Sequence, residues 1–144
     1  MIATVAVGTD GSPTAERAVQ AALDLAARYE AKVVFISAYK PIDDVRLRRE
    51  QRDAPPEHHW RINPTEDVDA ILREAEELAT ERGLRWASEA SEGDPADVLL
   101  NLAEKHDADV IVVGNKGMDR RVLGSVPNTI SHKATCSVFI VKTT

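Results

Sequence analysis

The sequence is poor in cysteine and has no long apolar run. Cys136 is the one cysteine in 144 residues, so the chain forms no internal disulfide, and this fits a reducing cytoplasm. No apolar run approaches the ~20 residues that a membrane-spanning helix needs. The N-terminus enters a short strand pattern at once and lacks the charged start and apolar run of a signal peptide. We therefore expect a cytoplasmic protein with no membrane partner.

Basic residues are in the minority. The chain has 18 Lys and Arg against 24 Asp and Glu, a formal net charge of -6 and a pI of about 5.2. General binding to nucleic acid or to a membrane surface requires a basic face. We therefore expect no nucleic-acid partner, although a local group of basic residues would still hold phosphate.

Residue patterns typical of metal and catalytic sites are also lacking. His58 and His59 are adjacent, so their rings diverge, and His106 and His132 lie far from them in sequence. No spacing of His and Cys resembles zinc ligation. Cys136 lies among apolar residues, where we expect a small buried side chain, and nothing in the sequence identifies a base for it. We expect no metal site, no catalytic residues and no enzymatic activity beyond slow hydrolysis.

Apolar strand patterns alternate with amphipathic helix patterns along the chain. Such alternation predicts an α/β domain with one open parallel sheet, helices on both faces and right-handed crossovers. Helix starts are predicted at Ser12-Pro13 and Asp94-Pro95, where a capping side chain precedes proline. The whole chain, 1–144, reads as one domain with a long irregular loop at about 40–64. The five strands are expected at 2–8, 32–39, 84–90, 108–113 and 137–142.

Two of the predicted strands, the first and the fourth, end in a glycine followed by a polar loop. The loops read GTDG at 8–11 and GNKG at 114–117. Ligands of open parallel sheets bind beyond the carboxyl ends of the strands, where the strand order reverses. If these two strands are neighbours at that point, their loops face each other across one crevice.

The second of these loops has features of an anion site. Gly114 and Gly117 allow close approach of backbone to a ligand, and Gly124-Ser125 begins a helix with free N–H groups and a partial positive charge. This combination favours phosphate binding. It is neither a Walker A motif nor G-x-G-x-x-G, and the alternative is a purely structural connection.

Charged residues near the two loops have two interpretations each. Asp10 follows the first strand as a candidate acceptor for ribose hydroxyls, or as a turn residue that supplements a helix cap. Lys116, Arg120 and Arg121 lie near the expected phosphates, where charge-assisted bonds would form. The alternative for these three is a solvated basic loop.

Motifs spread over essentially the whole chain read VAVGTDGS at 5–12, GDPA at 93–96, ADVIVVG at 108–114, GSVPN at 124–128 and CSV at 136–138. Together they resemble the universal stress protein family. The resemblance implies an adenine nucleotide alpha-hydrolase-like fold with sheet order 3-2-1-4-5, and a homodimer formed through the last strand, about Ser137 to Lys142. The sequence GNKGM at 114–118 is similar to the actinobacterial branch of the family.

The resemblance also implies the ligand and its contacts. Family members with G-x2-G-x9-G-[ST] bind ATP. In them the residue that matches Asp10 contacts the ribose, backbone near Ala38 meets the adenine, and the glycine motif holds ribose and phosphates. We therefore predict a stress-response binding module for ATP, with Mg²⁺ as a further candidate. The predicted site residues are Gly8, Thr9, Asp10, Ala38, Val113, Gly114, Lys116, Gly117, Arg121, Gly124, Ser125 and Val126.

The glycine motif departs from the family pattern in its spacing. The chain reads G-x2-G-x6-G-S, because only Met118 to Leu123 lie between Gly117 and Gly124. We expect the shorter loop either to narrow the phosphate cradle, which favours ADP, AMP or cyclic AMP, or to weaken nucleotide binding overall. Two other hypotheses stay open: a dimeric interaction protein of the same fold that binds no ATP, and a nucleotide hydrolase or transferase, which would need a base and a metal ligand.

Overall fold

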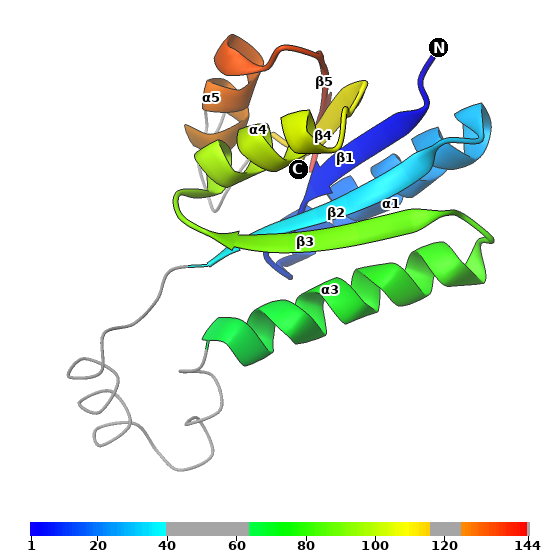
Figure 1. Ribbon diagram of the computed structural model, residues 1–144, viewed down its shortest axis with the longest axis horizontal. Helices are drawn as coiled ribbons and strands as arrows, with labels where there is room; N and C mark the ends of the chain where they lie inside the picture. The colour runs from blue at the N-terminus through cyan, green and yellow to red at the C-terminus, as the bar shows by residue number, and fades with distance from the viewer. Residues whose placement is uncertain (40–63, 116–124, 144) are drawn as a thin grey trace.

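The computed structural model describes residues 1–39, 64–115 and 125–143, which form one parallel sheet between helices (Figure 1). The strand order is β3-β2-β1-β4-β5, as the family resemblance implies. All four strand pairings are parallel. The elements are β1 (Thr4–Gly8), α1 (Pro13–Tyr29), β2 (Lys32–Tyr39), α3 (Pro64–Glu81), β3 (Trp86–Glu92), α4 (Pro95–Lys105), β4 (Val110–Gly114), α5 (Ser125–Lys133) and β5 (Ser137–Val141).

Helices cover both faces of the sheet, because the central strands are apolar on both sides. Val5 and Val7 of β1 face a core cluster formed with α1 and α3. Ala6, between them, faces a second cluster formed with α4 and α5. The predicted arrangement of helices on both faces is therefore confirmed (Figure 1).

The predicted helix starts of α1 and α4 are confirmed. The Ser12 side chain accepts a hydrogen bond of 3.1 Å from the Ala15 N–H, and Pro13 is the first helical residue. The Asp94 carboxylate accepts from two N–H groups of the first turn of α4. These caps fix where the chain leaves a strand and enters a helix on the carboxyl side of the sheet.

Strand β3 begins two residues later than the sequence predicts. Gly83 has φ +69, and the Leu84 N–H donates to the Ala79 carbonyl, so Leu84 completes the end of α3. The alternating pattern at 84–90 is real, but its first residue, Leu84, belongs to this helix end, whereas the Arg85 carbonyl already accepts from the Val33 N–H of β2. β3 lies at the edge of the sheet, as predicted.

Strands β1 and β4 also begin later than predicted, at Thr4 and Val110. The Asp109 side chain explains where both strands begin. Its Oδ2 accepts hydrogen bonds from the N–H groups of Ala3 and Thr4, at 2.8 and 3.0 Å. These two donors hold the pKa of Asp109 below its usual range. The carboxylate thus takes the place of a backbone carbonyl at the start of the β1–β4 pair.

The predicted irregular loop at about 40–64 lies outside the described residues, apart from Pro64, the first residue of α3. Among the helices that the structure describes, none has the combination of length and apolarity required to cross a membrane.

Candidate functional site

The two glycine-ended strands lie side by side at the centre of the sheet. β1 and β4 pair directly, with Val5 opposite Val110 and Val7 opposite Val112. The chain passes from β1 to β2 on one side, whereas β4 and β5 lie on the other side. The strand order therefore reverses between β1 and β4, and the Asp10 loop and Gly114 share the carboxyl edge. This confirms the neighbour relation on which the predicted crevice depends.

The loop after β1 is held by buried polar contacts. The Thr9 N–H donates to the Ile36 carbonyl at 2.9 Å, and the Ser37 hydroxyl donates to the Thr9 carbonyl at 2.8 Å. Thr9 and Ser37 are only 8% and 3% exposed, so these bonds form away from water. They fix the backbone on which Asp10 is presented.

Asp10 is exposed, and one of its two oxygens is engaged. Its Oδ1 accepts a hydrogen bond of 2.9 Å from the Ser12 N–H. Asp10 therefore has the turn role that was one of its two interpretations from the sequence. A carboxylate accepts several hydrogen bonds through two oxygens, so this bond leaves capacity for a ligand hydroxyl. The turn also orients the side chain toward the start of α1.

Neighbouring side chains pack closely against Gly8 and Gly114. A Cβ at Gly8 would lie 3.2 Å from Leu99 Cδ2 of α4. At Gly114 it would lie 3.1 Å from Thr14 Cγ2 and 3.2 Å from Thr143 Cγ2. The sequence predicts close approach of a ligand at Gly114, and the structure adds close contact with the Thr14 and Thr143 side chains.

The remaining described site residues lie on or beside the face covered by α4 and α5. Val113 is buried in that core cluster, and Ala38 and Val126 pack against it. Ser125 is exposed at the first residue of α5. The structure therefore brings residues from β2, β4 and α5 to one side of the sheet.

Four predicted site residues lie outside the described residues, namely Lys116, Gly117, Arg121 and Gly124. Their contribution to phosphate binding stays a prediction.

Sequence reasoning missed a polar cluster at the end of β4. Asn115 Oδ1 accepts from the Thr143 N–H at 2.9 Å and from its hydroxyl at 2.8 Å, and the Asn115 N–H donates to Val141. Arg17 Nη1 donates to the Thr143 carbonyl at 3.1 Å. No local pattern identifies Thr143, because its partners are far away in sequence.

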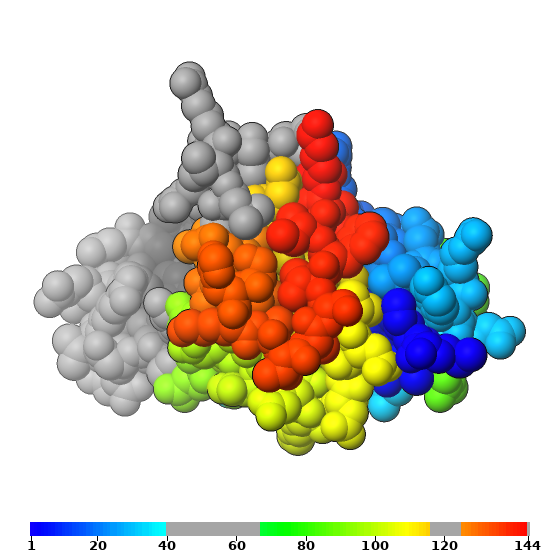
Figure 2. Space-filling view, turned by 90° about the horizontal axis from the view of Figure 1, so that it is seen from above, coloured from blue at the N-terminus to red at the C-terminus, as the bar shows by residue number. Residues whose placement is uncertain are grey.

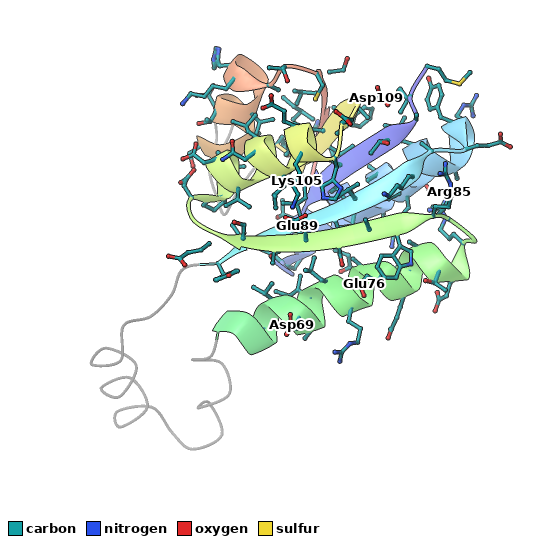
Figure 3. All side chains as sticks on the ribbon, viewed as in Figure 1. Asp69, Glu76, Arg85, Glu89, Lys105 and Asp109 are labelled. Carbon is teal, nitrogen blue, oxygen red and sulfur yellow. The ribbon has the colours of Figure 1, made fainter. Side chains whose placement is uncertain are left out.

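A charged cluster joins β3 to the end of α4, away from the two glycine loops. Lys105 Nζ lies 2.8 Å from Glu89 Oε2, and His106 Nε2 lies 3.0 Å from Glu89 Oε1 (Figure 3). The hydrogen bond from Lys105 and then that from His106 hold the pKa of Glu89 below its usual value. Its position in mid-strand indicates a structural role.

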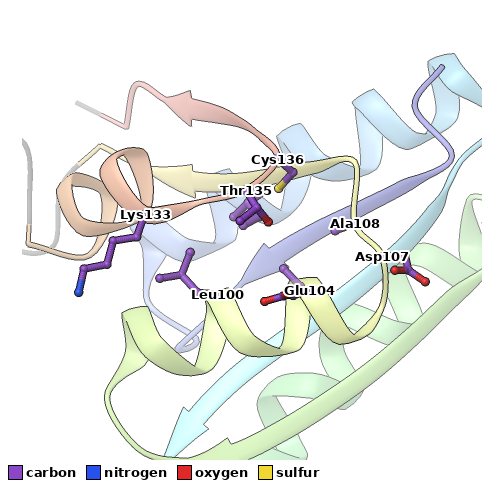
Figure 4. A pocket seen from close by; sticks show the side chains of 9 residues that line it. Leu100, Glu104, Asp107, Ala108, Lys133, Thr135 and Cys136 are labelled. Carbon is purple, nitrogen blue, oxygen red and sulfur yellow. The ribbon is translucent and has the colours of Figure 1, made fainter.

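A separate hollow of about 240 Å³ lies at the opposite, amino edge of the sheet (Figure 4). Cys136 is partly buried there, and burial raises the pKa of its thiol, so the reactive thiolate is disfavoured. Within the part of the chain that the structure describes, no group of three His, Cys, Asp or Glu residues is placed to hold a metal ion. The hollow is lined by Leu100, Ala103, Glu104, Asp107, Ala108, Ile111, Lys133, Thr135 and Cys136.

Comparisons with known proteins agree on one family. The model of the universal stress protein family matches residues 1–142. The chain is 39% identical over 146 residues to universal stress protein Rv1636 of Mycobacterium tuberculosis, covering 98% of this chain and 97% of that protein.

Solved structures show the same fold. A universal stress protein crystallised in complex with cAMP has a TM-score of 0.74 and 34% identity, covering 99% of this chain and 98% of that one. A family protein from Arabidopsis thaliana with AMP bound has a TM-score of 0.68 and covers 97% of this chain and 91% of that one. Its identity of 18% supports the fold alone.

Proposed function

The chain belongs to the universal stress protein family, and from that membership we propose that it binds an adenine nucleotide at the carboxyl edge of β1 and β4. One observation carries the proposal: the exposed Asp10 loop and Gly114 lie on adjacent strands where the strand order reverses. Open parallel sheets bind their ligands at this place.

The proposed contacts divide between the two sides of the crevice. Asp10 accepts hydrogen bonds from the ribose hydroxyls through the carboxylate lone pairs that are not used in the bond to the Ser12 N–H. Backbone near Ala38 meets the adenine. The exposed start of α5, at Ser125, faces the phosphates, since a helix N-terminus offers free N–H groups and partial positive charge.

Two observations bear on which adenine nucleotide is preferred. The retained glycine anchors make ATP, with Mg²⁺ as a further candidate, the first ligand that the motif suggests. The six-residue spacing from Met118 to Leu123 is shorter than the nine of the ATP-binding pattern and favours a smaller phosphate group. The cAMP complex of a protein 34% identical to this chain favours cyclic AMP as the second candidate.

We further propose a cytoplasmic homodimer that acts by binding rather than by catalysis. β5 is an edge strand, and its Phe139 and Ile140 are 47% and 39% exposed. Figure 2 shows residues of β5 at the surface beside α5. Exposed apolar residues on an edge strand are typical of an interface. A regulatory role in the stress response follows from the family. The competing function is a dimeric interaction protein that binds no nucleotide.

Isothermal titration calorimetry with ATP, ADP, AMP, cyclic AMP and GTP tests the proposed nucleotide binding. We expect heat of binding with at least one adenine nucleotide and none with GTP. Asp10→Asn should weaken binding about tenfold, the value of one hydrogen bond to a charged group. Asp107→Asn is the matched control at the amino edge, where the backbone φ of 54 tolerates asparagine. Absence of heat with every adenine nucleotide at millimolar concentration would favour the interaction protein.

A further inference from the structure

Thr143, just beyond β5, is buried and makes hydrogen bonds through all its polar groups. It is 7% exposed. Its N–H and hydroxyl both donate to Asn115 Oδ1, at 2.9 and 2.8 Å, and its carbonyl accepts from Arg17 Nη1 at 3.1 Å. A buried polar residue with every group paired is held in one position, because any displacement leaves donors without acceptors.

Asn115 is held through its backbone and its side chain by residues at and just beyond the end of β5. Its N–H donates to the Val141 carbonyl at 2.8 Å, and its side chain accepts from Thr143, two residues further along. This pairing continues the β4–β5 register one step beyond Gly114, which pairs with Val141. The position of Asn115, directly after β4, is therefore fixed by residues at and just beyond the end of β5.

The contacts of Thr143 also reach the other side of the crevice. Its Cγ2 methyl group and that of Thr14 approach Gly114 together, at 3.2 and 3.1 Å from the position of an added Cβ. Thr14 and Arg17 both belong to α1, which begins directly after the Asp10 loop. Thr143 thus connects the first turns of α1 with the end of β4.

We propose that Asn115 and Thr143 form a clasp that positions the two halves of the nucleotide crevice, so that both are positioning residues for ligand binding. The inference rests on the proposed nucleotide site. Affinity depends on loops that are already in their bound geometry, because ordering them on binding costs free energy. Asn115→Ala leaves the buried N–H and hydroxyl of Thr143 without an acceptor, so the end of β4 loosens.

Two variants test the clasp by nucleotide affinity. Asn115→Ala should raise the calorimetric Kd for cyclic AMP, or for ATP if only ATP binds, about tenfold, and Thr143→Val, which removes only the hydroxyl donor, about threefold. Thr143→Ser keeps the donor and should restore the affinity. The exposed residues Asn101 and Thr135 supply matched controls, Asn101→Ala and Thr135→Val, that leave the Kd unchanged.

A third control separates positioning from general stability. Val110 is buried at the other end of β4, so Val110→Ala should lower the melting temperature without changing the Kd. If Val110→Ala weakens nucleotide binding as much as Asn115→Ala does, the clasp has only a structural role.

Amide hydrogen exchange of the ligand-free protein tests the clasp without nucleotide. We expect slow exchange at Asn115 and Thr143, and faster exchange at Thr143 in Asn115→Ala. Rapid exchange at Thr143 in the wild type would overturn the clasp itself. Unchanged Kd values in variants with rapid exchange would overturn only its positioning role. Absence of nucleotide binding by the wild type would overturn the proposed function and this role together, while the exchange result still reports the clasp.

Discussion

Gly11 combines a left-handed backbone with close contact to another helix. Its φ is +80, and an added Cβ would lie 2.9 Å from Ile71 Cγ1 of α3. The sequence predicts a turn at Asp10-Gly11, but the contact with α3 appears only in the folded chain. This one residue therefore sets how closely α3 approaches the loop that presents Asp10.

Gly11→Ala should destabilise the protein by about 2–4 kcal/mol, the sum of left-handed strain and overpacking. Urea unfolding measures the loss. In an Ile71→Ala background the cost of the same change should fall to about 1–2 kcal/mol, because only the strain remains. Gly83→Ala is the control, since Gly83 has φ +69 and no atom within 4 Å of an added Cβ. Equal costs in all three cases would show that contact with Ile71 is irrelevant.

For single residues, the sequence predicts a role correctly where the hydrogen-bond partners are close together in the chain. The Ser12 cap and the turn at Asp10 involve bonds to residues two or three positions away. Thr143 escapes prediction because its bonds to Asn115 and Arg17 join residues 28 and 126 positions apart. Only the folded chain brings these residues together.

Glu89 joins the edge strand β3 to the end of α4, and the stabilisation it gives depends on pH. Its pKa is lowered from 4.5, chiefly by Lys105 and then by His106. A lowered folded-state pKa means that the stabilisation is complete above the unfolded pKa and is lost as pH falls through the folded pKa. Glu89 and Lys105 side chains are 28% and 63% exposed, so water screens the pair and keeps its contribution small.

Glu89→Gln should lower the free energy of unfolding by about 0.5 kcal/mol at neutral pH, and the difference should shrink below about pH 4.5. Urea unfolding of both proteins at several pH values between about 3 and 8 measures it. Glu104→Gln, an exposed change on α4, is the control and should show no such trend. A difference that grows as the pH falls would contradict the assigned direction of the pKa shift.

The type and order of the nine elements within residues 1–39, 64–115 and 125–143 follow from the apolar patterns of the sequence, whereas several boundaries do not. Leu84 has a strand-like pattern but closes the end of α3 through its N–H. The start of β4 depends on Asp109, whose carboxylate binds the N–H groups of Ala3 and Thr4. Secondary-structure propensity depends on neighbouring residues in the sequence, whereas the ends of these strands are set by hydrogen bonds made in the folded chain.

The proposed homodimer has a specific consequence for the free edge of β5. Phe139→Lys should convert a dimer to a monomer in sedimentation velocity, because it places a charge among the apolar residues of that edge. Trp86→Lys is the control at the opposite edge strand, β3, where Trp86 is 38% exposed. A wild-type monomer, or a dimer that only Trp86→Lys disrupts, would contradict an interface at β5.

For the whole molecule, the apolar patterns predict the sheet and its two covered faces, and they predict that the Asp10 and Gly114 loops meet if the first and fourth strands are neighbours. The strand order itself came from the family resemblance, since alternation alone does not choose among parallel arrangements. In the proposed function, nucleotide preference depends on the shortened stretch from Met118 to Leu123, which lies outside the described residues. Ligand choice therefore has to be measured.

An NMR titration of ¹⁵N-labelled protein with cyclic AMP, AMP and ATP tests the proposed site most directly. A nucleotide at the carboxyl edge should shift the amide signals of Asp10, Asn115 and Val126, and leave those of Asp107 and Cys136 at the amino edge unchanged. Shifts centred on the amino-edge hollow, or no shifts with any of the three nucleotides at millimolar concentration, would contradict a nucleotide site between β1 and β4.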